Sequence, residues 1–235
     1  MHLLATLPQT RVELTFDRDL DGPPHLRARQ LRGSLARLFA ADDAFHQHDS
    51  SGRHLYRYPA IHYRWRGGRG LVVGWRESAQ RVLQLPWLDL PLRLGDEAVR
   101  VTDALLVSDN SVFGVSDRLC HYRLVSPVLL LNQDNYRRYQ TLDAAGQRGE
   151  RDRLLVAQLL MTLRGLQVDF PCQLYAALVQ PAAQGCFYKQ QTLLGFKGGI
   201  VCNAVLPDGL AIGHAASHGY GWLEADGPLP DEARP

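Results

Sequence analysis

The stretch from Leu55 to Trp75 decides the fold. It reads Leu-Tyr-Arg-Tyr-Pro-Ala-Ile-His-Tyr-Arg-Trp-Arg-Gly-Gly-Arg-Gly-Leu-Val-Val-Gly-Trp. Apolar and aromatic residues fill Leu55–Trp65 and Gly70–Trp75, and Arg66-Gly67-Gly68-Arg69 lies between the two runs. This pattern is typical of two strands joined by a tight turn. We therefore predict a β-hairpin here.

Strands and helices alternate on both sides of this hairpin. The segment Arg11–Asp17 alternates polar and apolar residues, as a half-buried strand does. His25–Phe39 has apolar residues at helical spacing with arginines between them, which predicts an amphipathic helix with an arginine-rich surface. A short helix over Glu77–Leu85 and a strand over Ala98–Leu106 complete the order β-α-β-β-α-β. This is the order of the ferredoxin-like module.

A second set of elements follows Asp109–Asp117, which we interpret as a linker. Its strong helix is predicted over Glu150–Gly165, where leucines recur and a glycine ends the pattern. The other expected elements are a strand at Arg118–Pro127, a polar irregular stretch at Asn132–Tyr139, and strands at Leu174–Leu178, Leu193–Val205 and Gly221–Glu224.

The sequence thus predicts an α+β fold of two tandem ferredoxin-like (RRM-like) βαββαβ modules with a C-terminal glycine-rich loop. It leaves open whether the second module is degenerate. The expected domains are 1–110 and 118–225, followed by a flexible tail over 226–235 that contains three prolines.

Composition narrows the class of protein. With 46% hydrophobic and 21% charged residues, the chain has the composition of a soluble globular protein. No run approaches the roughly 18 apolar residues of a membrane helix, and the N-terminus lacks the pattern of a signal peptide. Four cysteines occur without a C-x-x-C pair, so we expect buried, reduced thiols rather than a zinc site. A cytoplasmic location follows as an expectation.

The positive charges are almost all arginines. Only Lys189 and Lys197 are lysines, which leaves 24 arginines, and 12 of these lie between Arg11 and Arg76. Arginine binds phosphates bidentately and stacks on bases better than lysine does. A GC-rich genome would give the same bias, so this is a weak indication of an anionic partner.

A glycine-rich loop lies near the C-terminus. Gly213, Gly219 and Gly221 allow the backbone to approach a ligand closely, and their amides can form an anion-binding concavity. A plain loop is the alternative, because glycine is common in turns. Neither the dinucleotide-binding fingerprint nor the phosphate-binding P-loop is present.

The spacing Gly213-x5-Gly219-x-Gly221 resembles the signature of the CRISPR-associated repeat-RNA endoribonucleases, within the superfamily of repeat-associated RNA-binding proteins (RAMP) with ferredoxin-like folds. The resemblance covers most of the chain, from about Arg11 to Leu223. Further segments carry it. Gln30–Phe39 resembles the family's first helix. A two-domain branch with a His-x-His pair is resembled by Phe45–His48 followed by Leu55–Tyr63, and by Ser126–Tyr136 and Leu194–Gly198.

The histidine pair His46 and His48 is the candidate catalytic centre. Histidine suits proton transfer because its pKa lies near neutral pH, and RNA cleavage by the 2′-hydroxyl needs one base and one acid. Solvated loop histidines and a zinc-ligand pair are the alternatives from spacing alone. The resemblance implies the catalytic role, with the domain over 1–110 carrying the pair.

Further site residues follow from the resemblance and from charge. Tyr56 lies where the branch has a tyrosine linked to activity, and Arg32 and Arg37 are candidates for stabilising the phosphorane. For Asn132 and its polar neighbours, a self-capping turn is the alternative to RNA contact. The candidate RNA-binding residues are Arg27, Arg29, Arg57, Asn132, Gln133, Asn135, Lys197, Gly213, His214, His218, Gly219 and Gly221.

The glycine-rich loop departs from the family at two places. Many members carry lysine or arginine inside the loop, whereas this chain has His214 and His218. Because neutral histidines bind phosphate less tightly, we expect the glycine amides and the arginines of the first half to contribute more.

The resemblance implies an endoribonuclease that binds precursor CRISPR transcripts and cuts once per repeat to yield guide RNAs. It would act without metal or cofactor and leave 2′,3′-cyclic phosphate and 5′-hydroxyl ends. A non-catalytic RNA-binding subunit of an effector complex is the alternative function, and a metal-dependent hydrolase is a third. Repeat RNA is the expected partner, no membrane contact is expected, and homodimerisation and contacts with effector subunits stay open.

Overall fold

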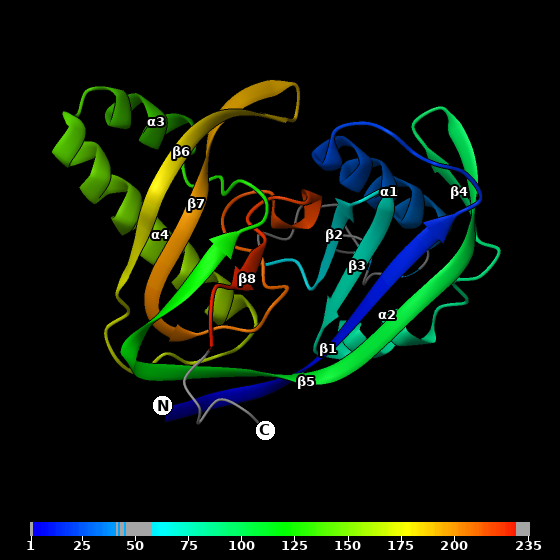
Figure 1. The fold of residues 1–235 in the computed structure, drawn as a ribbon, viewed down its shortest axis with the longest axis horizontal. Coiled ribbons are helices and arrows are strands. Elements are labelled where there is room, and N and C mark those ends of the chain that lie inside the picture. The colour runs from blue at the N-terminus through cyan, green and yellow to red at the C-terminus, as the bar shows by residue number, and fades with distance from the viewer. Residues whose placement is uncertain (1, 41, 43–44, 46–57, 229–235) are drawn as a thin grey trace. The chain divides into compact units, whose positions relative to one another are not determined.

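A computed structural model describes residues 2–40, 42, 45 and 58–228 of the chain (Figure 1). The chain divides into two compact units. The N-terminal unit comprises residues 7–111 and 217–219, and the C-terminal unit comprises residues 1–6, 112–216 and 220–235. Each unit is built on an antiparallel sheet.

The N-terminal unit has the predicted order of elements. These are β1 (His2–Phe16), α1 (Pro24–Leu38), β2 (Ile61–Arg66), β3 (Arg69–Trp75), α2 (Glu77–Gln84) and the first half of β5 (Glu97–Leu124). The strands lie in the order β2-β3-β1-β5, so the first and last strands of the module are neighbours. This arrangement confirms a ferredoxin-like module in the N-terminal unit.

The hairpin from which the fold was predicted is present. Arg66 pairs with Arg69, and Gly67 and Gly68 between them have φ angles of 56° and 77°. Two consecutive positive φ angles define the two-residue turn whose twist matches that of the strands, and glycine adopts them without steric cost. The sequence therefore specified this turn locally.

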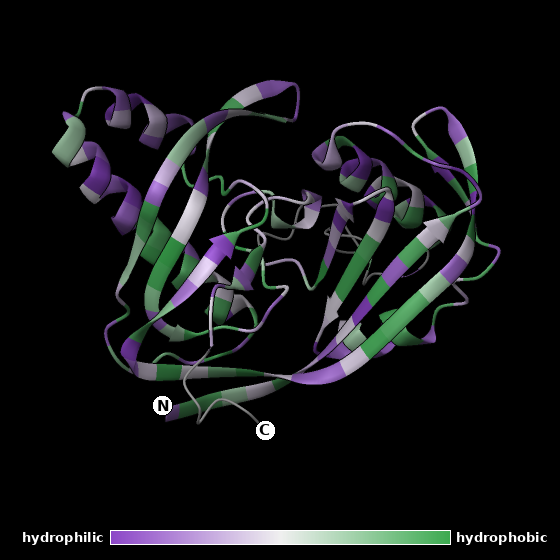
Figure 2. Cartoon of the chain, viewed as in Figure 1, coloured by the Kyte–Doolittle hydropathy of each residue, from purple (hydrophilic) through white to green (hydrophobic). Residues whose placement is uncertain are grey.

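The core of the N-terminal unit lies between the sheet and its helices. Alternate residues of β1, Val12 and Leu14, are fully buried, as are Leu31 and Leu35 one helical turn apart on α1. Helix α1 packs on β2, and α2 packs on β3. Figure 2 shows the apolar and polar residues alternating along β1, which is the pattern expected of a strand with one buried face.

Two features differ from the sequence-based prediction. A short strand, β4 (Pro91–Leu94), forms a second hairpin with the start of β5. The expected linker at Asp109–Asp117 is wrong, because these residues lie inside β5, which continues to Leu124. In this segment Ser111, Gly114 and Ser116 are buried small or polar residues, so the apolar alternation that would have identified a strand is missing.

The C-terminal unit repeats the strand order of the first module. Its sheet runs β8 (Leu223–Ala225), β5, β7 (Gln191–Val205) and β6 (Ala176–Tyr188). Helix α4 (Ala144–Gly165) packs on β6. Among the described residues, the segment between β7 and β8 holds only a single 3-10 turn, η2 (Ala216–His218), where the N-terminal module has its second helix. The fold class is confirmed, and the second module is degenerate.

The stretch predicted to be irregular is a helix. Helix α3 (Gln133–Gln140) begins where the side chain of Asn132 accepts a hydrogen bond from the amide of Asn135 at 2.8 Å. Its residues are almost all polar, which hid the helical periodicity. Helix α4 also begins six residues before the predicted Glu150, since Asp143 caps it through the amide of Gly146.

The cysteines and the membrane prediction can be checked against the described residues. Cys120, Cys186 and Cys202 are buried free thiols, as predicted, while Cys172 is exposed. Within the described part of the chain, no helix is both long and apolar enough to span a membrane.

Candidate nucleic-acid interface

The proposed catalytic residues His46, His48 and Tyr56, and the RNA-binding candidate Arg57, lie outside the described residues. The residues on either side of them pack within the N-terminal unit. Phe45 is only 3% exposed, and its ring packs against Phe39 with centroids 5.1 Å apart. Tyr58 contacts His62 edge-on at 5.2 Å. The chain is therefore anchored in the N-terminal unit directly before and after the candidate catalytic segment.

Helix α1 carries the arginines that the sequence singled out. Arg29 and Arg37 are exposed and Arg32 is half-buried. Arg29 and Arg32 are three residues apart, so they lie on the same side of the helix. Arg37 donates a hydrogen bond of 3.4 Å to the carbonyl of Arg93. These three guanidinium groups give the N-terminal unit a cationic helix surface.

Arg27, on the same helix, is placed differently. Its side chain is 9% exposed and pairs with Glu97 at 2.7 Å. It also donates to the carbonyl of Asp21 at 2.6 Å and to the amide oxygen of Gln30 at 3.1 Å. These contacts tie α1 to the start of β5, so they give Arg27 a structural role and leave little of its guanidinium for a phosphate.

Beneath α1 lies a buried tyrosine that the sequence analysis did not identify as a site residue. The hydroxyl of Tyr63 has no hydrogen-bond partner in the described part of the chain. Burial raises the pKa of Tyr63, the charge of Arg32 acts to lower it, and the carboxylate of Asp42 acts to raise it. A buried hydroxyl without a partner costs about 1–3 kcal/mol. No signal in the sequence distinguishes Tyr63 from other strand tyrosines.

His62, the neighbour of Tyr63, is a neutral structural histidine. Burial, with a smaller contribution from the charge of Arg64, lowers the pKa of His62 to about 3. The Nε2 atom lies 2.9 Å from the carbonyl oxygen of Pro59, to which it donates in the neutral form. Because Pro59 and Tyr58 directly follow the candidate catalytic segment, His62 holds its downstream end.

The glycines of the C-terminal loop permit close packing. Gly213 and Gly221 have φ angles of 82° and 69°. A Cβ atom on Gly221 would lie 1.8 Å from the carbonyl oxygen of Ile212, and one on Gly213 would lie 2.7 Å from that of Leu129. The amide of Gly221 donates to the carbonyl of Pro127 at 2.8 Å, so it is used inside the unit.

The middle of this loop belongs to the N-terminal unit. Residues 217–219 cluster with it, and a Cβ atom on Gly219 would lie 2.9 Å from the Cβ of Ala28 on α1. The Oγ of Ser217 lies 3.1 Å from Nδ1 of His218. The structure therefore brings His218 and Gly219 into the same unit as Arg29, Arg32 and Arg37.

The remaining RNA-binding candidates lie in the C-terminal unit. Burial lowers the pKa of His214, so its half-buried ring is neutral at neutral pH. Gln133 and Lys197 are exposed, and Asn135 is half-buried. Asn132 caps α3, which confirms the self-capping alternative for that residue. The described residues contain no group of three or more His, Cys, Asp or Glu side chains that could hold a metal ion.

Comparisons with known families match both halves of the chain. Residues 6–111 match the Cas6b N-terminal domain, and residues 114–225 match the Cas6b C-terminal domain. An uncharacterised protein of Methanocaldococcus jannaschii, MJ0978, is 30% identical over 130 residues, which is 55% of this chain and 88% of that protein.

Solved structures share the fold. A crystal structure of Cas6b has a TM-score of 0.85 at 20% identity and covers 94% of this chain and all of its own. A second, described as the CRISPR RNA processing endoribonuclease Cas6b, has a TM-score of 0.70 at 20% identity over 93% of this chain and all of its own. A Cas6 product complex (TTHB231) has a TM-score of 0.57 at 15% identity and covers 94% of this chain and all of its own.

Proposed function

The chain belongs to the Cas6b family, and from this premise we propose that it is an endoribonuclease that cuts CRISPR repeat RNA within each repeat to release guide RNAs. One observation carries the proposal: both domains of the family match in order, over residues 6–111 and 114–225. Relatives with the same fold include proteins described as CRISPR RNA processing endoribonucleases. The family relation supports repeat-RNA processing, while the chemistry below is argued from this chain's residues.

The proposed reaction uses the nucleophile that RNA itself supplies. The 2′-oxygen attacks the adjacent phosphorus as its proton passes to a base, and the bond to the 5′-oxygen breaks as that oxygen takes a proton from an acid. His46 and His48 divide these two roles, because imidazole both accepts and donates protons near neutral pH. The products are a 2′,3′-cyclic phosphate and a 5′-hydroxyl, and no metal is required.

Charge near the phosphorane is supplied by α1. Arg32 and Arg37 are the proposed stabilising groups, since a guanidinium forms charge-assisted hydrogen bonds to phosphate oxygens. Tyr56 is proposed to orient the 2′-hydroxyl or to donate to a phosphate oxygen. Phe45 directly precedes His46 in the chain, and its ring packs against Phe39, just beyond the end of α1.

RNA binding is proposed to use the same unit. Exposed Arg29 on α1 offers a phosphate contact, and residues 217–219 of the glycine-rich loop pack against that helix at Ala28. His218 is proposed to contact RNA there. Gly219 supports this contact because, without a Cβ atom, it lets the loop backbone lie against α1. The amide of Gly221 is already bonded inside the chain and is not offered to RNA.

The experiment is cleavage of the repeat RNA from a CRISPR array near the gene. The RNA is incubated with purified protein in EDTA, and the product ends are analysed. We expect one cut per repeat, a 2′,3′-cyclic phosphate and a 5′-hydroxyl. A repeat with a 2′-deoxynucleotide at the mapped site is the control and should stay intact. Loss of cleavage in EDTA with recovery on adding a divalent cation would refute the metal-free mechanism.

A further inference from the structure

The positive charge of the C-terminal unit is concentrated on helices α3 and α4. They hold six of the eight arginines between residues 112 and 228, together with three acidic residues, and a fourth, Asp143, caps α4. Figure 2 shows α3 as hydrophilic over most of its length. Helix α3 buries only Tyr139, so the charged residues on it face solvent.

The acidic residues of these helices mostly serve the fold. Asp143 caps α4 through the amide of Gly146 at 2.8 Å, and Asp152 accepts a hydrogen bond from the amide of Leu178 on β6 at 3.0 Å. Glu150 accepts two hydrogen bonds from Arg153, at 2.8 and 2.7 Å. Two guanidinium groups near Glu150, those of Arg138 and Arg151, are left without a carboxylate of their own among the described residues.

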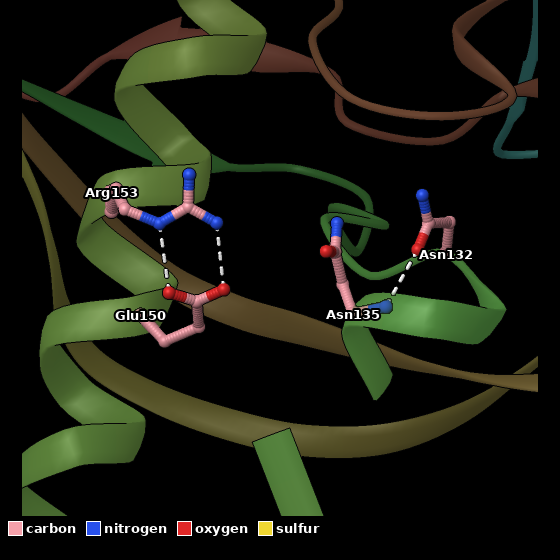
Figure 3. A network of polar contacts seen from close by, with 4 residues as sticks. All are labelled: Asn132, Asn135, Glu150 and Arg153. Carbon is pink, nitrogen blue, oxygen red and sulfur yellow. Dashed lines mark hydrogen bonds and ion pairs between the residues drawn. The ribbon is translucent and has the colours of Figure 1, made fainter. Parts of the chain in front are cut away.

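Glu150 is the centre of this cluster. Its side chain is 4% exposed, whereas that of Arg153 is 56% exposed (Figure 3). The hydrogen bonds from Arg153 hold the pKa of Glu150 below its usual value, and the charge of Arg138 acts in the same direction. The carboxylate is therefore ionised. It orients the guanidinium of Arg153, and the positive charge of Arg138 on α3 also stabilises it.

Arg151 is held in place by aromatic groups. Its Nη1 donates to the hydroxyl of Tyr139 at 3.0 Å, and its guanidinium carbon lies 5.5 Å from the centre of the Phe196 ring. Such a contact orients the guanidinium while leaving its charge uncompensated. On α3, the side chain of Arg137 is 72% exposed and pairs only with the exposed Asp134, at 4.0 Å. An exposed ion pair at this distance contributes little to stability.

We propose that the surface of α3 around Arg137 and Arg138, with Arg151 of α4 beside Tyr139, is a second RNA-binding surface, which takes phosphates of the repeat RNA outside the bond that is cut. The inference rests on the proposed function. Arginine forks match phosphate oxygens bidentately, and positive charge that no nearby carboxylate balances is complementary to an RNA backbone. Tyr136, 38% exposed and next to Arg137, adds a ring on which an unpaired base can stack.

The test replaces the two exposed arginines of α3. In the double variant Arg137→Gln/Arg138→Gln, single-turnover cleavage of the full repeat RNA is measured with protein in excess. We expect the protein concentration at half-maximal rate to rise about tenfold, which corresponds to about 1.4 kcal/mol. The slope of log affinity against log salt should become shallower by about 1.4, the value for two lost contacts with single-stranded RNA.

The matched control removes the same charge elsewhere in the unit. Arg118→Gln/Arg164→Gln changes two exposed arginines, one on β5 and one in the last turn of α4. Equal effects of the two double variants would show that only net charge matters and would overturn the proposal. Direct binding of the repeat RNA, measured by fluorescence anisotropy, separates a specific RNA-binding surface from a general effect of net charge. If wild-type protein cuts no RNA, the proposed function fails, while the binding comparison still decides the surface.

Discussion

The ring of Phe45 packs against the ring of Phe39 with centroids 5.1 Å apart and planes inclined by 36°. Phe45 is almost fully buried in the core of the N-terminal unit, and Phe39 caps the end of α1. The next residue in the chain is His46. The two rings thus connect the end of the arginine-bearing helix α1 with the residue that directly precedes the candidate catalytic segment. Loss of this contact should therefore affect cleavage.

Replacing Phe45 with alanine should lower both stability and cleavage. Loss of a buried phenylalanine costs about 3–5 kcal/mol of unfolding free energy, which urea titration measures. We expect the saturating cleavage rate of folded Phe45→Ala to fall further than that of Leu92→Ala, a buried residue of the same core on β4. Equal rates in the two variants would show that Phe45 has no role beyond packing.

The histidine pair makes the sharpest prediction about the reaction. His46→Ala and His48→Ala should each lower the single-turnover rate by about 10²–10⁴-fold, the usual contribution of one proton transfer. RNA affinity should stay close to that of wild type. His121→Ala, at an exposed position on β5, is the control and should cleave normally. Cleavage by the double variant at the same site and rate would end the catalytic assignment.

The sequence predicted those parts of the fold that local pattern determines. The turn at Gly67 and Gly68 and the helices α1 and α4 follow from residue type and periodicity, which need no knowledge of distant neighbours. The segment at Asp109–Asp117 was misread because β5, although it lies between other strands, has the small or polar residues Ser111, Gly114 and Ser116 at buried positions. Helix α3 was missed because it is held by its cap at Asn132 and buries a single residue.

At the candidate site, too, local pattern predicted some features and tertiary contacts determined the others. Exposed arginines on α1 were identifiable from helical spacing, because periodicity indicates which side chains face solvent. The burial of Arg27, Tyr63 and His62 was not identifiable, because it depends on tertiary contacts that local pattern does not show. Nor did glycine spacing reveal that Gly219 packs on Ala28, a contact between residues nearly 200 positions apart in the chain.

The contact of Gly219 with Ala28 predicts a cost for any side chain at position 219. Gly219 has a φ angle of 86°, and an added Cβ would lie 2.9 Å from that of Ala28. Backbone strain of this kind costs about 1–3 kcal/mol. We expect Gly219→Ala to lower the midpoint of urea unfolding and to weaken RNA binding.

A second substitution separates the two causes of that loss. Adding Ala28→Gly removes the steric contact but leaves the backbone strain at position 219. We expect it to restore part of the RNA affinity of Gly219→Ala while the unfolding midpoint stays low, because glycine inside α1 is itself unfavourable. If Gly219→Ala binds RNA as wild type does, residues 217–219 do not form part of the RNA-binding surface.

His62 predicts a loss of stability in acid. Its pKa is about 3 in the folded protein and near 6.5 in the unfolded chain, so the unfolded state binds the proton more tightly. The contribution of neutral His62 is therefore complete above pH 6.5 and is lost progressively as the pH falls toward 3. Between pH 6.5 and 4.5 the loss should amount to about 2 kcal/mol. His62→Gln retains a donor for the Pro59 carbonyl but does not titrate, so its unfolding free energy should depend less on pH by about one proton. Parallel pH dependence of the two proteins, measured by urea unfolding, would show that His62 is accessible to protons in the folded state.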